Sequence, residues 1–136
     1  MPIVVDAVAI VAAIDRREQW HRKSKRLFHE LPKPFLTCEA AVSESCYLLG
    51  ESKAALESVM MMLSAGVVSI EFSLGKEVAT VQYLMNRYHS VPMSLADACL
   101  VRMSEIFDAP VFTFDSDFRI YRRHRRKLIP LIGIDN

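Results

Sequence analysis

The segment that most constrains this chain is PVFTFDSDF at residues 110–118, because it has the pattern of a buried strand that ends in two carboxylates. Residues 111–114 are β-branched or aromatic, and such a run is typical of a central parallel strand covered on both faces. Asp115 and Asp117 follow at once. In an open α/β sheet, ligands bind beyond the carboxyl ends of the strands, so both side chains are expected to face a site. The alternative is an Asp-Ser-Asp turn that only ends the strand.

The composition is that of one globular domain spanning residues 1–136, with 51% hydrophobic and 24% charged residues. An odd count of three cysteines without C-x-x-C spacing argues against a disulfide framework or a zinc site and fits a reducing compartment. The apolar opening at residues 2–14 is interrupted by Asp6, lacks a basic leader and is too short for a membrane helix. We therefore expect a cytoplasmic protein with no membrane association.

The apolar patterning along the chain predicts alternating strands and helices. Strands are expected at residues 3–5, 35–36, 67–70, 111–114 and 128–132, and helices at 7–15, 18–31, 37–49, 51–65, 74–89, 94–107 and 118–124. Thr37 is the predicted N-cap of the third helix, and Pro130 predicts an edge position for the last strand. With right-handed crossovers, this order gives a three-layer α/β/α domain around a mainly parallel sheet.

Further acidic residues are expected near the same edge of the sheet. Asp6 ends the first predicted strand, so it meets Asp115 if the two strands are parallel. Glu44 lies beside the inward stripe of its helix, where an unpaired carboxylate is costly to bury. Asp97 lies in the first turn of the helix that begins after Ser94, where it can also serve only as the acidic half of a capping box.

Carboxylates gathered this closely repel one another unless a cation neutralises them. A ligand set made of oxygen atoms alone selects a hard ion, Mg²⁺ or Mn²⁺. No histidine or cysteine is placed to make a zinc site. The sequence therefore predicts a magnesium or manganese centre at the sheet edge.

The basic residues are concentrated, although the formal net charge is only +1. Twelve of the 17 lysines and arginines lie in residues 16–26 and 119–127. Local patches of this kind can bind a polyanion even when the average charge is near zero. The alternative for both segments is a solvated helix face, which for residues 119–127 would also offset the charge of the acidic site.

Four short motifs, VVDAVAI, SESCYLL, SLADACLVRMSE and VFTFDSDF, occur in an order and spacing that resembles the PIN domain family. In size and layout the chain is similar to the toxin ribonucleases of bacterial VapBC-type toxin–antitoxin pairs. The resemblance covers the whole chain. It implies a three-layer fold with a five-stranded parallel sheet and an acidic site that cuts RNA with Mg²⁺ or Mn²⁺.

The resemblance also assigns roles by position. It implies catalytic carboxylates at Asp6, Glu44, Asp97 and Asp115, metal ligands at Asp6, Asp97, Asp115 and Asp117, and an orienting hydroxyl at Thr113. One departure is that Ala7 and Val8 provide no hydroxyl directly after the first aspartate. The absence removes a contact expected to orient Asp6, which predicts weaker metal affinity.

The implied reaction is metal-assisted hydrolysis of a phosphodiester bond. Arg119, Arg122 and Arg123 follow the acidic residues and are expected to contact flanking phosphates of RNA. The resemblance further implies homodimers and a small antitoxin protein as partner. The alternative is a catalytically weak or inactive PIN-like protein that binds RNA or a partner.

Overall fold

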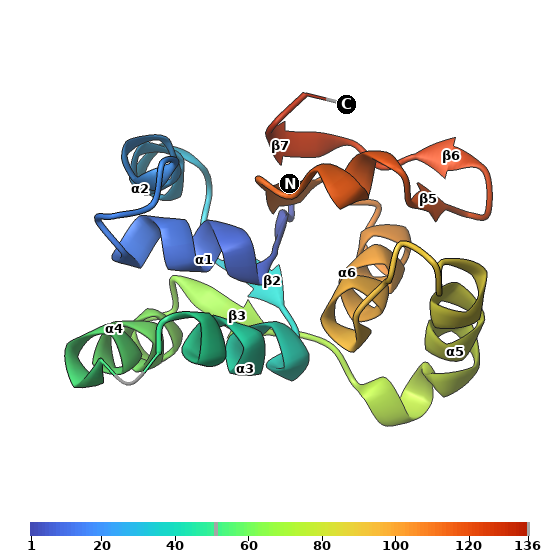
Figure 1. The fold of residues 1–136 in the computed structure, drawn as a ribbon, viewed down its shortest axis with the longest axis horizontal. Helices are drawn as coiled ribbons and strands as arrows, with labels where there is room; N and C mark the ends of the chain where they lie inside the picture. The colour runs from blue at the N-terminus through green and yellow to red at the C-terminus, as the bar shows by residue number, and fades with distance from the viewer. Residues whose placement is uncertain (51, 136) are drawn as a thin grey trace.

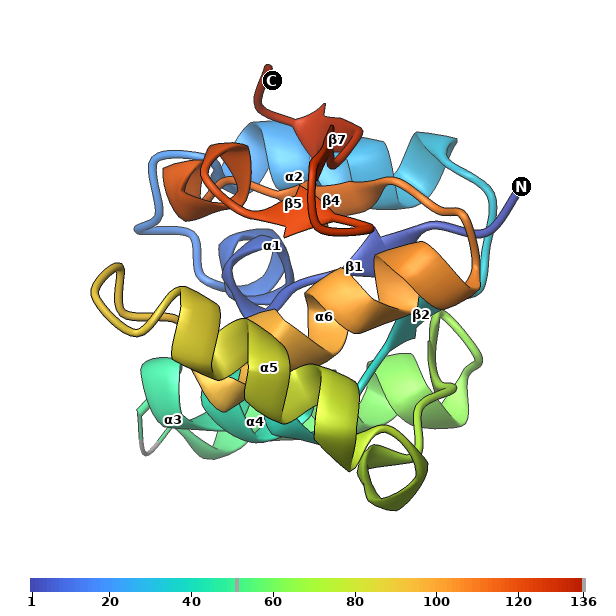
Figure 2. The ribbon, with the colours of Figure 1, turned by 90° about the vertical axis from the view of Figure 1, so that its right-hand side faces the viewer.

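The structure, a computed structural model, describes residues 1–50 and 52–135 as a five-stranded parallel sheet with helices on both faces (Figures 1 and 2). The sheet contains β1 (Val4–Val5), β2 (Phe35–Thr37), β3 (Val68–Ile70), β4 (Val111–Thr113) and β7 (Leu131–Gly133), in the order β3-β2-β1-β4-β7. The helices are α1 (Ala7–Ile14), α2 (His21–Glu30), α3 (Glu39–Leu48), α4 (Lys53–Ser64), α5 (Val78–Arg87) and α6 (Leu95–Ile106). The predicted three-layer fold is confirmed.

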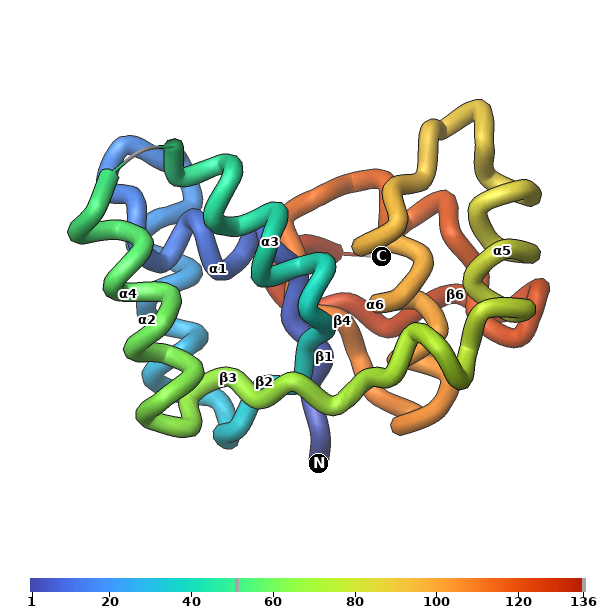
Figure 3. The backbone as a smooth tube through the Cα atoms, turned by 90° about the horizontal axis from the view of Figure 1, so that it is seen from below, coloured from blue at the N-terminus to red at the C-terminus, as the bar shows by residue number. Residues whose placement is uncertain are grey.

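Strand residues alternate between two hydrophobic cores, as the two-residue period of a strand requires. Val4 and Val111 pack with side chains of α5 and α6. Val5 and Phe112 point to the other face and pack with side chains of α1, α2 and α4. The view in Figure 3 shows α5 and α6 on one side of the strands and α1, α2 and α4 on the other. Because both faces are covered, the apolar run before Asp115 is fully buried.

The segment after the acidic strand end differs from the predicted helix at residues 118–124. The structure has a short 3-10 helix, η2 (Ser116–Arg119), and then a hairpin of β5 (Arg122–Arg123) and β6 (Lys127–Leu128). His124 and Arg125 make its turn with φ of 51° and 70°. Such turns usually contain glycine, asparagine or aspartate, and none of these is present to indicate one. The hairpin also takes Leu128 out of the predicted last strand, and β7 begins only after Pro130, at the sheet edge as predicted.

Other helix boundaries also differ from the prediction. Thr37 ends β2 and donates its hydroxyl to the Val5 carbonyl, so Cys38 is the N-cap of α3. The predicted helix at residues 74–89 is divided into a 3-10 turn, η1 (Leu74–Lys76), and α5. Glu51, the predicted start of the fourth helix, lies outside the described residues. Within the described ranges, no helix is long and apolar enough to cross a membrane.

Candidate active site

Sheet topology brings the two strand-end aspartates together. Strands β1 and β4 are parallel neighbours with Val5 opposite Phe112, and the Asp6 N–H donates to the Phe112 carbonyl at 3.1 Å. Asp6 and Asp115 therefore leave the sheet at the same carboxyl edge. The first turn of α6 carries Asp97 to this edge, since α6 packs against β1 and β4.

Asp6 is buried, and both of its carboxylate oxygens accept hydrogen bonds. Oδ1 accepts from the Ala9 N–H at 3.0 Å, which caps α1, and Oδ2 accepts from the Thr113 hydroxyl at 2.5 Å. Burial raises the pKa of Asp6 to about 7, and the nearby Asp97 and Asp115 add to the rise, while the two hydrogen bonds oppose it. The sequence has no hydroxyl directly after Asp6 to orient its carboxylate. The Thr113 hydroxyl of β4 and the Ala9 N–H of α1 orient it instead.

Asp97, Asp115 and Asp117 form the tightest acidic group, with one carboxylate oxygen from each lying within 4.8 Å of the others. The Thr113 hydroxyl accepts from the Asp115 N–H, and Asp115 Oδ1 accepts from the Asp117 N–H, both at 2.9 Å. Burial raises the pKa of Asp97, with Asp115 and Asp117 adding to the effect. Burial and Asp115 also raise the pKa of Asp117. Asp97 and Asp117 are therefore held beside Asp115 at a cost that comes from burial first and from repulsion second.

Glu44 lies on α3 at the rim of this group. Its carboxyl group is half-buried, and burial raises its pKa, with smaller contributions from Asp97 and Asp115. It lines a hollow with Tyr47 and Leu95, next to the first turn of α6. Glu44 is not one of the three residues whose carboxylate oxygens meet within 4.8 Å. The structure thus places Glu44 beside the cluster rather than in it.

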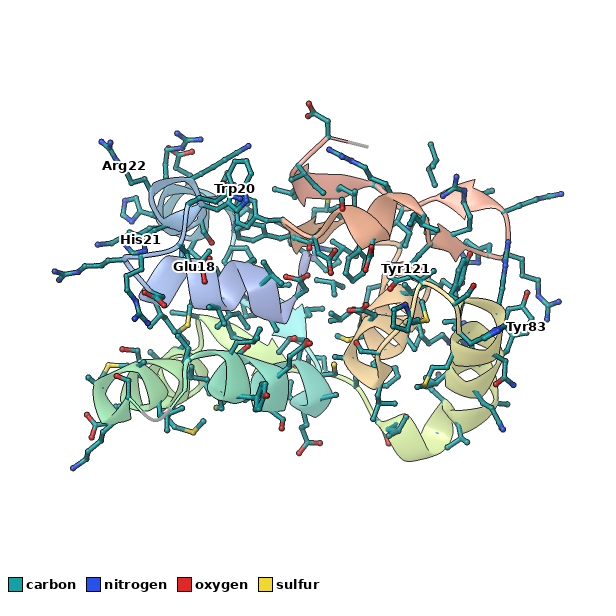
Figure 4. All side chains as sticks on the ribbon, in the orientation of Figure 1. Glu18, Trp20, His21, Arg22, Tyr83 and Tyr121 are labelled. Carbon is teal, nitrogen blue, oxygen red and sulfur yellow. The ribbon has the colours of Figure 1, made fainter. Side chains whose placement is uncertain are left out.

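Tyr121 is a component of the site that the sequence analysis did not identify. Its buried hydroxyl donates to Asp97 Oδ2 at 2.7 Å, and Figure 4 labels it where the C-terminal ribbon lies against α6. Burial and the neighbouring Asp97 carboxylate raise the pKa of Tyr121 far above neutrality, so its hydroxyl remains a donor. Tyr121 lies between the 3-10 helix η2 and β5, and no local sequence pattern there indicates such a contact.

The three arginines after the acidic residues have different surroundings. Arg119 is exposed, and its Nε donates to the Asp135 carbonyl at 2.6 Å. One nitrogen of Arg122 donates to three backbone carbonyls of residues 119–121. Arg123 is paired with Asp108 at 2.9 Å and with the Ser104 carbonyl at 3.2 Å. Ser104 lies seven residues after Asp97 on α6, so the Arg123 guanidinium contacts this helix about 10 Å away from Asp97.

The two basic segments extend toward opposite ends of the molecule from β7, near which both have a contact. Arg22 projects from α2 at one end of the long axis, and Tyr83 marks α5 at the other end (Figure 4). The Arg125 guanidinium stacks over the Tyr83 ring at 4.4 Å, which places the hairpin turn at that second end. The two segments approach each other near β7, since Lys23 Nζ donates to the Gly133 carbonyl and Arg119 Nε to the Asp135 carbonyl, both at 2.6 Å.

The donor chemistry of the acidic group fits a hard divalent cation. All three side chains offer carboxylate oxygens, and neither histidine nor cysteine belongs to the group among the residues described. Oxygen ligands are those that Mg²⁺ and Mn²⁺ prefer in proteins. Burial raises the pKa values of Asp97 and Asp117 and the repulsion among the carboxylates adds to the rise, and a bound cation would relieve that repulsion.

The fold and this group define an α/β/α domain with an acidic centre at the carboxyl edge of a parallel sheet. The PIN domain family matches residues 3–123, and the chain belongs to this family. Among solved structures, it is similar to VapC20 of Mycobacterium tuberculosis, which is described as a toxin that cleaves the sarcin–ricin loop. The two chains share 20% identity with a TM-score of 0.79, over 94% of this chain and 99% of VapC20. No curated protein sequence gives a significant match.

Proposed function

We propose that this chain is a metal-dependent endoribonuclease that hydrolyses RNA phosphodiester bonds. The observation that carries the proposal is the convergence of Asp97, Asp115 and Asp117, with Asp6 and Glu44 beside them, at one sheet edge. A purely structural turn would not require three carboxylates within 4.8 Å, because like charges at that distance destabilise the fold. Membership in the PIN domain family supports the same function.

In this proposal, Asp97, Asp115 and Asp117 hold Mg²⁺ or Mn²⁺, and Asp6 completes the acidic environment. The ion would lower the pKa of a bound water and stabilise negative charge on the phosphate and the leaving oxygen. Thr113 orients Asp6 and Asp115, since its hydroxyl contacts both residues. Glu44 stands beside the cluster with a raised pKa, which suits it to accept a proton from the attacking water.

The two basic segments, which approach each other near β7 through Lys23 and Arg119, support RNA as the substrate. We propose that Arg119, which is exposed and lies two residues after Asp117 in the chain, contacts a phosphate flanking the cleaved bond. Arg122 and Arg123 donate most of their hydrogen bonds to backbone carbonyls and to Asp108, so their contribution to RNA binding is expected to be smaller.

We further propose that the protein acts in the cytoplasm as the toxin of a toxin–antitoxin pair. The similarity to VapC20, which is described as a toxin, along nearly the whole length of both chains supports this role. The expected partners are a second copy of the chain and a small antitoxin protein. A gene for a short protein directly beside this one, whose product co-purifies with it, would support the pairing.

The test is cleavage of a mixed RNA pool with Mn²⁺, with Mg²⁺ and with EDTA. Wild-type protein should cut only with metal, and Asp97→Asn should lose at least 100-fold in rate. Glu57→Gln, a change at an exposed acid of α4, is the control and should cut normally. RNA binding without cleavage by folded wild-type protein, unaffected by Asp97→Asn, would instead identify an inactive PIN-like binding protein.

A further inference from the structure

Tyr121 makes a polar contact that its packing alone does not require. Its ring is fully buried and packs edge-on against Phe118 and Tyr88, with ring centroids 5.2 and 5.1 Å away. A phenylalanine would fill the same volume. The hydroxyl extends beyond this aromatic cluster and donates a hydrogen bond to Asp97 Oδ2 at 2.7 Å.

The backbone of Tyr121 is tied to the same site. Its N–H donates to the Asp117 carbonyl at 3.2 Å, and the Ile120 N–H donates to that carbonyl at 2.9 Å. The Tyr121 ring therefore has a defined position relative to both Asp117 and Asp97. Any movement of Asp97 away from Asp117 would have to break the bond from the tyrosine hydroxyl.

We propose that Tyr121 is a positioning residue for the metal site, whose hydroxyl, together with the Ser94 side chain, holds the Asp97 carboxylate where it meets Asp115 and Asp117. The inference rests on the metal-dependent function proposed above. A carboxylate on a helix can rotate, and a rotated Asp97 would no longer meet Asp115 and Asp117. Groups that orient metal ligands typically change metal affinity by 10-fold to 100-fold when they are removed.

The structure offers a matched control in Tyr88. This residue is also buried, and its hydroxyl also makes a hydrogen bond, accepting from the Arg122 N–H at 3.0 Å. Tyr88 makes no hydrogen bond with an acidic residue among those described. Tyr88→Phe therefore removes a comparable hydroxyl from the same aromatic cluster without changing a contact to Asp97.

The experiment measures Mn²⁺ binding directly, by titration calorimetry and by electron paramagnetic resonance, for the wild-type protein, Tyr121→Phe and Tyr88→Phe. We expect Tyr121→Phe to weaken Mn²⁺ binding about 10-fold or more and Tyr88→Phe to leave it within about twofold of wild type. Equal affinity for wild type and Tyr121→Phe would overturn the inference, as would equal losses in both variants. Absence of Mn²⁺ binding by the wild-type protein would overturn the proposed metal dependence as well.

A measurement on the wild-type protein keeps the test valid even if Tyr121→Phe does not fold. With ¹³C-labelled tyrosine, the signal of the Tyr121 ring carbon that bears the hydroxyl should shift during a Mg²⁺ titration and follow the same binding curve. The Tyr88 signal should shift less. A Tyr121 signal that stays constant while calorimetry reports Mg²⁺ binding would contradict the proposed role.

Discussion

The Thr113 hydroxyl donates a hydrogen bond to the Asp6 carboxylate from the neighbouring strand and, through its other side, accepts the Asp115 N–H. Thr113 and Asp6 are 107 positions apart in the chain. One side chain thus links both strand-end aspartates of the acidic site. Its position on β4, next to β1 in a parallel sheet, makes the link possible.

Thr113→Val, which keeps the shape of the side chain, should reduce nuclease activity by about 10-fold to 100-fold. It should also destabilise the protein by about 1–3 kcal/mol, because a buried carboxylate and a backbone N–H lose their partner. The measurements are RNA cleavage and urea unfolding. Thr37→Val is the control, since that buried hydroxyl donates to the Val5 carbonyl and makes no hydrogen bond with an acidic side chain in the described part of the chain. Equal activity of the two variants would contradict the orienting role of Thr113.

The stability of the metal-free protein should fall as the pH rises from about 4 to about 7. Folding raises the pKa of Asp6 from 3.8 to about 7, so in this window the folded state keeps a proton that the unfolded state has lost. Glu44, Asp97 and Asp117 shift in the same direction. For Asp6 alone, the loss is on the order of 4 kcal/mol above pH 7. Urea unfolding in EDTA at pH 4 and pH 8 measures it.

Asp6→Asn should remove the part of this pH dependence that comes from Asp6. The amide carries no charge, so the variant should be more stable than wild type at pH 8 in EDTA and close to wild type at pH 4. Added Mg²⁺ should stabilise wild type more than the variant, because it binds the charged form of the site. Glu57→Gln should leave the wild-type pH profile unchanged. A wild-type stability that rises between pH 4 and pH 8 would show that the acidic site is not strained.

Substitutions at Arg119 and Arg123 should have different effects, the first on RNA binding and the second on stability. Arg119→Ala removes an exposed cation two residues after Asp117, so it should weaken RNA binding and reduce the salt dependence by about one phosphate contact. Arg123→Ala should instead lower stability by about 1–3 kcal/mol, because its guanidinium pairs with Asp108 and the Ser104 carbonyl. Fluorescence titration at several salt concentrations and urea unfolding distinguish the two effects. The prediction is wrong if Arg123→Ala shows the larger change in salt dependence.

Gly133 should be required for stability and activity, because β7 lies close to Thr113 at this position. Its φ is +104°, and a Cβ at this position would lie 2.4 Å from the Thr113 carbonyl oxygen. Gly133→Ala should therefore cost at least about 1–3 kcal/mol and also reduce activity by displacing Thr113. Gly75→Ala is the control, since a Cβ there meets no atom within 4 Å. Thermal unfolding and RNA cleavage would reveal the difference, and similar results for both variants would refute it.

Much of the fold could be predicted from local pattern. Buried parallel strands require continuous apolar runs, and residues 111–114 have this pattern before Asp115. A strand that ends in an acidic residue brings its carboxylate to the sheet edge, which is why the sequence alone predicts that Asp6 and Asp115 lie there. The hairpin at residues 122–128 could not be predicted, because its turn uses His124 and Arg125 rather than residues that favour positive φ.

The sequence by itself determined the layer order, the parallel sheet and the set of acidic residues, because these depend on residue periodicity and on where each strand ends. Only the tertiary structure decided how the acidic residues are held. The bond from Tyr121 to Asp97 and the bond from Thr113 to Asp6 join segments that are distant in the chain. Tertiary packing also paired Arg123 with Asp108. Such contacts depend on the angles between packed elements, and no local spacing of residues encodes those angles.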